Sequence, residues 1–172
     1  ISMYEWLDKT DVLAKEHEEE QAAQENTRIR KALDVCNTNV MMANENLNIV
    51  YMNTAVQEMM ATAEADLKVA LPNFNAHQLM GVNVDVFHKN PAHQRGMLEK
   101  LSAVYKTDIE VGVRTFGLIA TPVFEDGQRL GTVVEWIDKT EALVLEFEAE
   151  RSAKENIRIR KALDVCNTNV MM

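Results

Sequence analysis

The stretch RTFGLIATPVFEDGQRLGTVVEWIDKT, residues 114–140, holds two long runs in which β-branched and other apolar residues recur. The runs, 114–124 and 129–138, are joined by EDGQ, in which Asp126 followed by Gly127 is a strong signal for a tight hairpin turn. The sequence therefore predicts two long antiparallel strands here, and these strands decide the class of fold.

Three other stretches of the same kind complete a predicted sheet. NTNVMMA (37–43) and LNIVYMN (47–53) are separated by asparagine residues, which tolerate the geometry of a tight turn. YKTDIEVG (105–112) precedes the long hairpin and has the composition of the remaining strand. The expected sheet thus has five antiparallel strands.

Helices are predicted between the second and third strands. Asn53 is a suitable cap for a short helix over 54–63, and residues 64–90 read as loops with short helical turns. Pro91 fits the first turn of a helix that runs to about Val104. Together these elements predict an α+β fold, with short helices and one long helix on one face of the sheet.

A long internal repeat relates the two ends of the chain. ENTRIRKALDVCNTNVMM (25–42) and ENIRIRKALDVCNTNVMM (155–172) differ at one position, and the same offset relates YEWLDKT (4–10) to VEWIDKT (134–140). The period is about 130 residues, far above the ~20–50 residues of solenoid repeats. A repeat of this length indicates similar domains in tandem, of which the chain is a piece.

The repeat divides the chain into five expected parts. Residues 1–10 would be the last strand of a preceding unit, and 11–33 an N-terminal linker helix. Residues 34–140 form the complete domain, 141–163 an exit helix, and 164–172 the first strand of a following unit. Both linkers are rich in helix formers and lack Gly and Pro.

Two modes of self-association are expected. Leu143, Phe147 and Ile157 form an incomplete apolar stripe, so the linker helices could pair in a homodimer, although a single solvated helix explains the stripe as well. Residues 167–172 repeat 37–42, so the second copy could replace this strand in another molecule and form a strand-swapped dimer.

Composition narrows the functional classes. The formal net charge of −9 argues against nucleic acid and against an anionic membrane surface as partners. No run approaches the ~20 apolar residues of a membrane span. The two cysteines, Cys36 and Cys166, occupy equivalent places in the repeat, so a disulfide between them is not expected. Free cysteines are typical of a reducing compartment, and a cytoplasmic location is predicted. The sequence has no catalytic triad, paired carboxylates, phosphate loop or zinc spacing, so no enzyme is predicted.

The stretch DVFHKNPAHQR, residues 85–95, contains two candidate metal ligands. His88 follows two apolar residues and is expected near an apolar wall, whereas His93 falls in the first turn of the predicted helix. The alternative for either residue is a polar side chain that bonds a nearby carbonyl. In the last strand, the alternation of side chains places Val134 and Trp136 on the same face.

Three segments carry a resemblance to a known family. NVMMANENLNIVYMNTAVQEMM, NVDVFHKNPAHQRGML and the hairpin stretch resemble the heme-binding PAS modules of soluble, aerotaxis-type methyl-accepting chemotaxis receptors. The similarity covers roughly Leu33 to Thr140, and VFHKNPAHQR and VVEWIDKT are typical of that group. The resemblance implies a PAS fold that binds heme b and senses oxygen, with carbon monoxide and nitric oxide as other candidate ligands. Neighbouring PAS units and a downstream signalling domain are the implied partners.

The resemblance also assigns roles in the site. It implies that His88 is the axial ligand of the iron, with His93 as the runner-up because another branch of PAS heme sensors uses a histidine of the long helix. It implies that the Trp136 indole donates to oxygen, which gains more negative charge on ferrous iron than carbon monoxide does. Ordinary core packing remains the alternative role for Trp136 and for Leu118. The implied pocket is completed by Phe87, Leu118 and Val134.

Trp136 lies two residues before Asp138, so ligand binding is hypothesised to shift the last strand and the helix that begins at DKT. Two other functions stay open at this point: a PAS interaction or dimerisation module without a cofactor, and a PAS domain for another small molecule. A flavin photosensor is disfavoured because Cys36 precedes the first strand.

Overall fold

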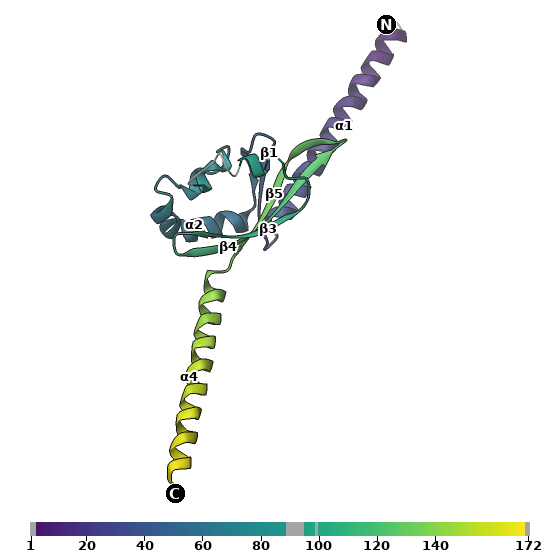
Figure 1. Cartoon of the computed structure of the whole chain (residues 1–172). Coiled ribbons are helices and arrows are strands. Elements are labelled where there is room, and N and C mark those ends of the chain that lie inside the picture. The colour runs from purple at the N-terminus through teal and green to yellow at the C-terminus, as the bar shows by residue number, and fades with distance from the viewer. Residues whose placement is uncertain (1–2, 89–94, 99, 171–172) are drawn as a thin grey trace.

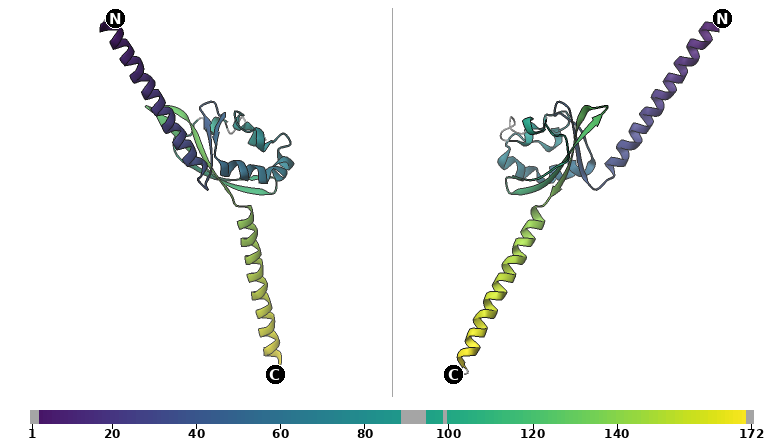
Figure 2. Two further views of the ribbon diagram at one scale, coloured as in Figure 1. Left: turned by 180° about the vertical axis from the view of Figure 1, so that it is seen from behind. Right: turned by 45° about the vertical axis from the view of Figure 1, so that its right-hand side comes forward.

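The computed structural model describes residues 3–88, 95–98 and 100–170, and side chains between residues 11 and 163 (Figure 1). A single folded domain lies between two long helices, α1 (Met3–Asp34) and α4 (Thr140–Val170), which leave it in opposite directions (Figures 1 and 2). The two termini therefore lie at opposite ends of the molecule.

The domain is built on a five-stranded antiparallel sheet, as the sequence predicts. The structure adds the strand order, which is β2-β1-β5-β4-β3. Asp126 and Gly127 connect the two long strands with φ values of 49° and 81°, the positive angles that a primed two-residue hairpin turn requires. The strands are β1 (Asn39–Asn44), β2 (Ile49–Met52), β3 (Tyr105–Val111), β4 (Arg114–Glu125) and β5 (Gln128–Asp138).

Helix α2 (Thr54–Ala70) is longer than the predicted 54–63, and the expectation of loop over 64–70 is wrong. The additional residues are mostly good helix formers. The buried residues repeat at helical spacing along the whole element, so the same face continues into the core. They are Val56, Met60, Ala63 and Leu67.

The predicted helix from Pro91 to about Val104 is confirmed only in part. Residues 95–98 are helical, but 100–104 are not, because the chain must reach the edge of the sheet where β3 begins at Tyr105. Pro91 and His93 lie outside the described residues. Two short 3-10 turns precede this region, η1 (Ala76–Gln78) and η2 (Val84–Phe87).

The strands expected at the two ends of the chain are helical in the structure. α1 runs through YEWLDKT at 4–10, and α4 continues through 164–170, so both strand predictions are wrong for these described residues. The internal copies form strands because β1 and β5 pair with each other and with further strands. A segment without a partner strand lacks the ladder bonds of a sheet, and a helix supplies backbone hydrogen bonds from within the segment itself. The assignment of the ends to neighbouring units, and strand exchange, stay predictions.

The linker helices expose their apolar side chains. Leu143, Phe147 and Ile157 on α4 are 42%, 67% and 55% exposed. They are available to a second helix, and the pairing of helices between two molecules stays a prediction.

No helix within the described part of the chain has both the length and the apolar character that a bilayer crossing requires.

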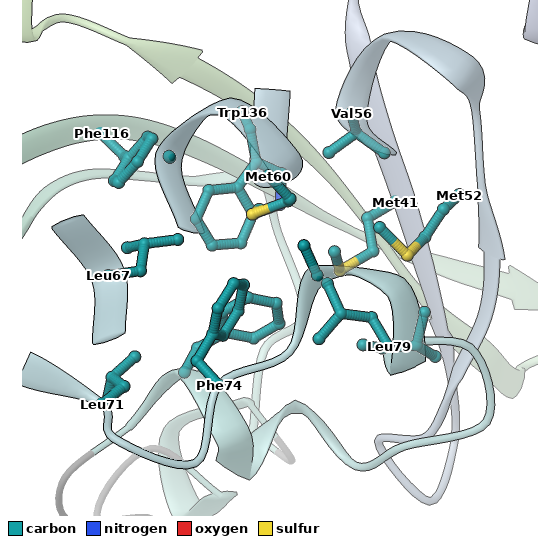
Figure 3. Close-up of a cluster of buried hydrophobic side chains, with 14 residues drawn as sticks. Met41, Met52, Val56, Met60, Leu67, Leu71, Phe74, Leu79, Phe116 and Trp136 are labelled. Atoms are coloured by element: carbon teal, nitrogen blue, oxygen red, sulfur yellow. The ribbon is translucent and has the colours of Figure 1, made fainter. Parts of the chain in front are cut away.

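The core lies between the inner face of the sheet and the segment from α2 to η2. Figure 3 shows Trp136 from β5 among side chains from β1, α2 and β4. Met41, Met60, Phe74 and Phe116 are each at most 2% exposed. Because methionine packs adaptably, the two Met residues can fill an irregular space beside the aromatic rings.

Asn53 is fully buried and joins three elements through its side chain. Its Oδ1 accepts from the backbone N–H of Val40 at 3.0 Å and of Val56 at 3.1 Å. Its Nδ2 donates to the carbonyls of Thr38 at 2.7 Å and Leu33 at 3.2 Å. The predicted cap of α2 is therefore confirmed, and the same side chain attaches the end of α1 to β1.

We expect Asn53→Ala to lower the free energy of unfolding by roughly 2–4 kcal/mol, because it removes a helix cap and leaves a buried N–H unpaired. Urea unfolding measures this loss. Asn46→Ala is the matched control, since the exposed Asn46 side chain bonds only Glu45 among the described residues. Equal unfolding midpoints for the two variants would contradict the role of Asn53.

Candidate functional site

The two long strands form one wall of a cavity. Leu118 on β4 pairs with Trp136 on β5, and Thr107 on β3 pairs with Leu118, so the three form one row across the sheet. Ala120 and Val134 are partners in the next row on the same face. Since side chains alternate along a strand, all five lie on the inner face.

The opposite wall comes from η2 and from residues 95–98, and the cavity between the walls measures about 280 Å³. This volume is just below the ~300–1,000 Å³ of most small-molecule sites. The structure brings all five predicted site residues, His88, Trp136, Leu118, Phe87 and Val134, into this one lining. The other lining residues are Met41, Val84, Met97, Leu98, Tyr105, Thr107, Ile109 and Ala120.

His88 is held in one orientation by the turn that precedes it. Its backbone N–H donates to the Asp85 carbonyl at 2.9 Å, and its Nδ1 lies 3.0 Å from the Val84 carbonyl. A carbonyl oxygen can only accept, so Nδ1 carries the proton and a neutral ring leaves the Nε2 lone pair open. This is the usual arrangement of a histidine that binds a metal.

The environment of His88 also favours its neutral form. Burial lowers the pKa of the imidazole, while the Val84 carbonyl and the Asp85 carboxylate oppose the shift in part, and the net pKa is lowered. A metal competes with a proton for the same lone pair, so a lowered pKa favours metal binding.

The turn that carries His88 is anchored by Asn83, which the sequence analysis missed. The Asn83 Oδ1 accepts from the Asp85 N–H at 3.3 Å, and its Nδ2 donates to the Asn46 carbonyl at 2.9 Å and to Asn48 Oδ1 at 3.0 Å. An asparagine just before a short turn is a detectable capping signal, but its long-range partners are not visible in the sequence.

Trp136 contains the one buried side-chain donor or acceptor that has no hydrogen-bond partner among the described residues, its Nε1. The residue is 6% exposed, and its ring centroid lies 5.2 Å from that of Phe87 and 5.8 Å from that of Phe116. A buried N–H without a partner costs about 1–3 kcal/mol, so such groups mark places where a ligand or strain is involved.

The residues of this cavity fit a b-type heme. Heme needs an apolar slot and one protein imidazole, and His88 supplies that imidazole within a largely apolar lining. Over the described chain, no group of three or more His, Cys, Asp or Glu side chains could hold a bare metal ion. The cavity is small for a porphyrin, and it borders solvent where Met97 and Tyr105 of its wall are 36% and 37% exposed.

The DKT residues tie α4 to the sheet beside the cavity. Asp138 Oδ1 accepts from the Thr140 N–H at 3.0 Å, and Thr140 Oγ1 accepts from the Thr115 N–H at 3.1 Å. Arg114 donates to Asp138 Oδ2 at 2.6 Å and to Asp66 of α2 at 2.7 Å. Burial opposes ionisation of Asp138, but the bonds from Thr140 and Arg114 prevail and lower its pKa.

Lys139, the middle residue of DKT, bonds a third strand. Its Nζ lies 2.7 Å and 2.9 Å from the two carboxylate oxygens of Asp108 on β3. The Lys139 side chain passes over Gly117. A Cβ atom at position 117 would lie only 2.7 Å from the Lys139 Cε, so the absence of a side chain there makes room for the lysine. The start of α4 is therefore attached to α2, β3 and β4, and the partners Arg114, Asp66 and Asp108 were missed by the sequence analysis.

Comparison with solved structures identifies the class of protein. The Aer2 receptor of Vibrio cholerae is 35% identical, with a TM-score of 0.54 over 59% of this chain and 93% of that one. The PAS domain of an HTR-like protein from Haloarcula marismortui is 8% identical, with a TM-score of 0.50 over 72% and 98% of the two chains, a likeness of fold alone. With this sheet and these helices, the chain belongs to the PAS domain family.

A curated relative adds the larger context. The methyl-accepting chemotaxis protein McpB of Pseudomonas aeruginosa is 49% identical over 140 residues, which are 81% of this chain but 20% of McpB. No protein-family model matches the sequence. The expected PAS fold and the relationship to chemotaxis receptors are thus confirmed, while the roles of the site residues stay predictions.

We expect Trp136→Phe to change the free energy of unfolding of the heme-free protein by less than about 1 kcal/mol, because the loss of packing is offset by removal of an unpaired buried N–H. Urea unfolding measures the change. For comparison, Phe116→Ala should cost about 3–5 kcal/mol in the same core. A loss of that size for Trp136→Phe would mean that the indole N–H has a partner.

Proposed function

We propose that this PAS domain is a heme-based sensor of oxygen within a chemotaxis-type receptor. One observation carries the proposal: a single apolar cavity is lined both by a histidine whose Nε2 is open and by a tryptophan whose N–H has no partner in the described chain. An unpaired buried N–H costs folding free energy, so packing does not explain it. A heme with a bound gas would occupy both groups, the iron at the His88 Nε2 and the gas at the Trp136 N–H.

In this proposal His88 holds the iron of heme b through Nε2. The bond from Nδ1 to the Val84 carbonyl maintains the required tautomer and makes the imidazole a stronger donor to the metal. Heme, when bound, supplies an iron with a coordination position open to a small gas. Phe87 and Val134 contribute apolar surface on which a porphyrin can pack.

Trp136 is proposed to select the gas. Its N–H is already desolvated, so donation to a ligand that carries partial negative charge gains more than it would in water. Oxygen carries more such charge in heme proteins than carbon monoxide does, and it is the ligand favoured by a donor. Leu118, directly across from Trp136, is proposed to pack over the ligand and to exclude water.

The relatives support both parts of the proposal. The Vibrio cholerae Aer2 receptor is described as a dual PAS-heme oxygen sensor, and McpB is a methyl-accepting chemotaxis protein. The chain spans about a fifth of McpB, so the signalling partner is proposed to lie in other parts of such a receptor. No catalytic activity is assigned to the domain.

The output is proposed to pass through β5 into α4. Trp136 and Asp138 lie on the same strand, and Asp138 both caps α4 and pairs with Arg114. A movement of the indole toward a ligand would displace the strand that carries this cap. For the ligand to bias the helix, the two states must differ in these contacts.

The first test is heme uptake. The purified protein, supplied with hemin, should show a Soret absorption band, and His88→Ala should bind heme at least about tenfold more weakly because the iron loses its protein ligand. His77→Ala is the control, since His77 is exposed on η1 away from the cavity. A wild-type protein that takes up no heme would favour the cofactor-free interaction module and overturn the proposal.

The second test is gas selectivity in Trp136→Phe. Loss of one charge-assisted hydrogen bond of about 1.5–3 kcal/mol should lower oxygen affinity roughly 10- to 100-fold, with a much smaller change for carbon monoxide. Flash photolysis and stopped-flow mixing give both affinities. Hydrogen exchange in the first turn of α4 should respond to oxygen in the wild type and lose this response in the variant. Equal effects on the two gases would reject the role of the indole.

A further inference from the structure

One wall of the cavity is a short helical turn, residues 95–98, which lies between the turn that carries His88 and the strand that carries Trp136. Met97 and Leu98 of this turn face the cavity. Both ends of the turn are attached to other elements by arginine side chains.

The first attachment is to the histidine turn. Arg95 Nε lies 3.1 Å and 3.0 Å from the two carboxylate oxygens of Asp85, and Arg95 Nη2 also bonds Asp85 Oδ2. The carbonyl of Asp85 accepts the backbone N–H of His88. One residue, Asp85, therefore contacts Arg95 through its side chain and positions His88 through its backbone.

The second attachment is to the output strand. Arg129 Nη1 donates to the carbonyl of Leu98, and Arg129 Nη2 donates to Thr132 Oγ1 at 2.6 Å. Thr132 is 2% exposed and lies on β5, four residues before Trp136. The end of the helical turn is thus bonded to the strand that leads to α4.

We propose that Arg95 and Arg129 are positioning residues that make residues 95–98 a strap between η2 and β5. The strap holds His88 at a set place relative to Trp136 and sets the width of the cavity between them. This inference rests on the proposed heme function, because its main consequence is the grip on heme.

A positioning role for Arg95 can be distinguished from a role in folding by comparing its effect on heme affinity with its effect on the free energy of unfolding. The Arg95 and Asp85 side chains are 50% and 22% exposed, and an ion pair of this exposure contributes little to folding. Loss of a group that orients a metal-binding histidine, by contrast, typically weakens metal binding about 10- to 100-fold. A positioning role therefore predicts a large change in heme affinity with little change in unfolding.

The chain offers a matched control. Lys68 pairs with Glu64 on α2, with side-chain exposures of 48% and 20%, close to those of Arg95 and Asp85. Neither Lys68 nor Glu64 lines the cavity. Lys68→Gln removes a comparable ion pair, and its heme affinity should equal that of the wild type.

The experiment compares Arg95→Gln, Arg95→Lys and Lys68→Gln in two measurements. In the heme-free protein, amide hydrogen exchange at His88 should be faster in Arg95→Gln than in the wild type, and unchanged in Lys68→Gln. On hemin titration, Arg95→Gln should raise the dissociation constant about 10- to 100-fold and shift the reduction potential, and Arg95→Lys should recover part of the affinity. Arg129→Gln should act in the same direction, through Leu98.

The outcomes for the strap and for the heme function are distinguishable. If the wild type binds heme and Arg95→Gln behaves like Lys68→Gln in both measurements, the strap is wrong and the heme function stands. If the wild type binds no heme, the proposed function fails, and hydrogen exchange alone decides the strap. Faster exchange at His88 then supports it, and unchanged exchange overturns it.

Discussion

The antiparallel pairing of β4 with β5 is the constraint on which the other features depend. Its register sets Leu118 beside Trp136, and strand alternation turns both toward the inner face. At the end of the same pair of strands, Arg114 reaches Asp138, where α4 begins. One ladder of backbone hydrogen bonds therefore positions both the wall of the cavity and the attachment of the exit helix.

The cavity differs from an ordinary core in the state of two of its polar side chains, those of His88 and Trp136. The core asparagine, Asn53, has all its polar atoms bonded, as buried groups normally do. In the cavity, His88 presents an open nitrogen, and Trp136 presents a buried N–H without a partner among the described residues. Phenylalanine at position 136 would avoid the cost of the unpaired donor, so stability alone does not explain the tryptophan.

Local signals in the sequence predicted much of the fold and part of the site. The strands follow from alternation, and the hairpin follows from Asp126 and Gly127, because both depend on residues close in the chain. The resemblance, together with the alternation in β5, placed His88 and Trp136 in one site. Asn83, Arg114 and the bonds of Arg95 to Asp85 were missed, because polar and charged residues reveal their partners only after distant segments fold together.

The repeated hexapeptide NTNVMM shows the difference between what local sequence determines and what the tertiary structure decides. At 37–42 it enters β1, where it pairs with β2 and β5, whereas in its second copy the described residues 167–170 continue α4. By itself the sequence determined the turn at 126–127, the cap of α2 and the alternation of inward and outward side chains, since these arise from contacts within a few residues. Only the tertiary structure decided whether NTNVMM is strand or helix, which charges pair, and which buried donor stays unpaired. The physical reason is that strand hydrogen bonds and buried partners are supplied by segments far apart in the chain.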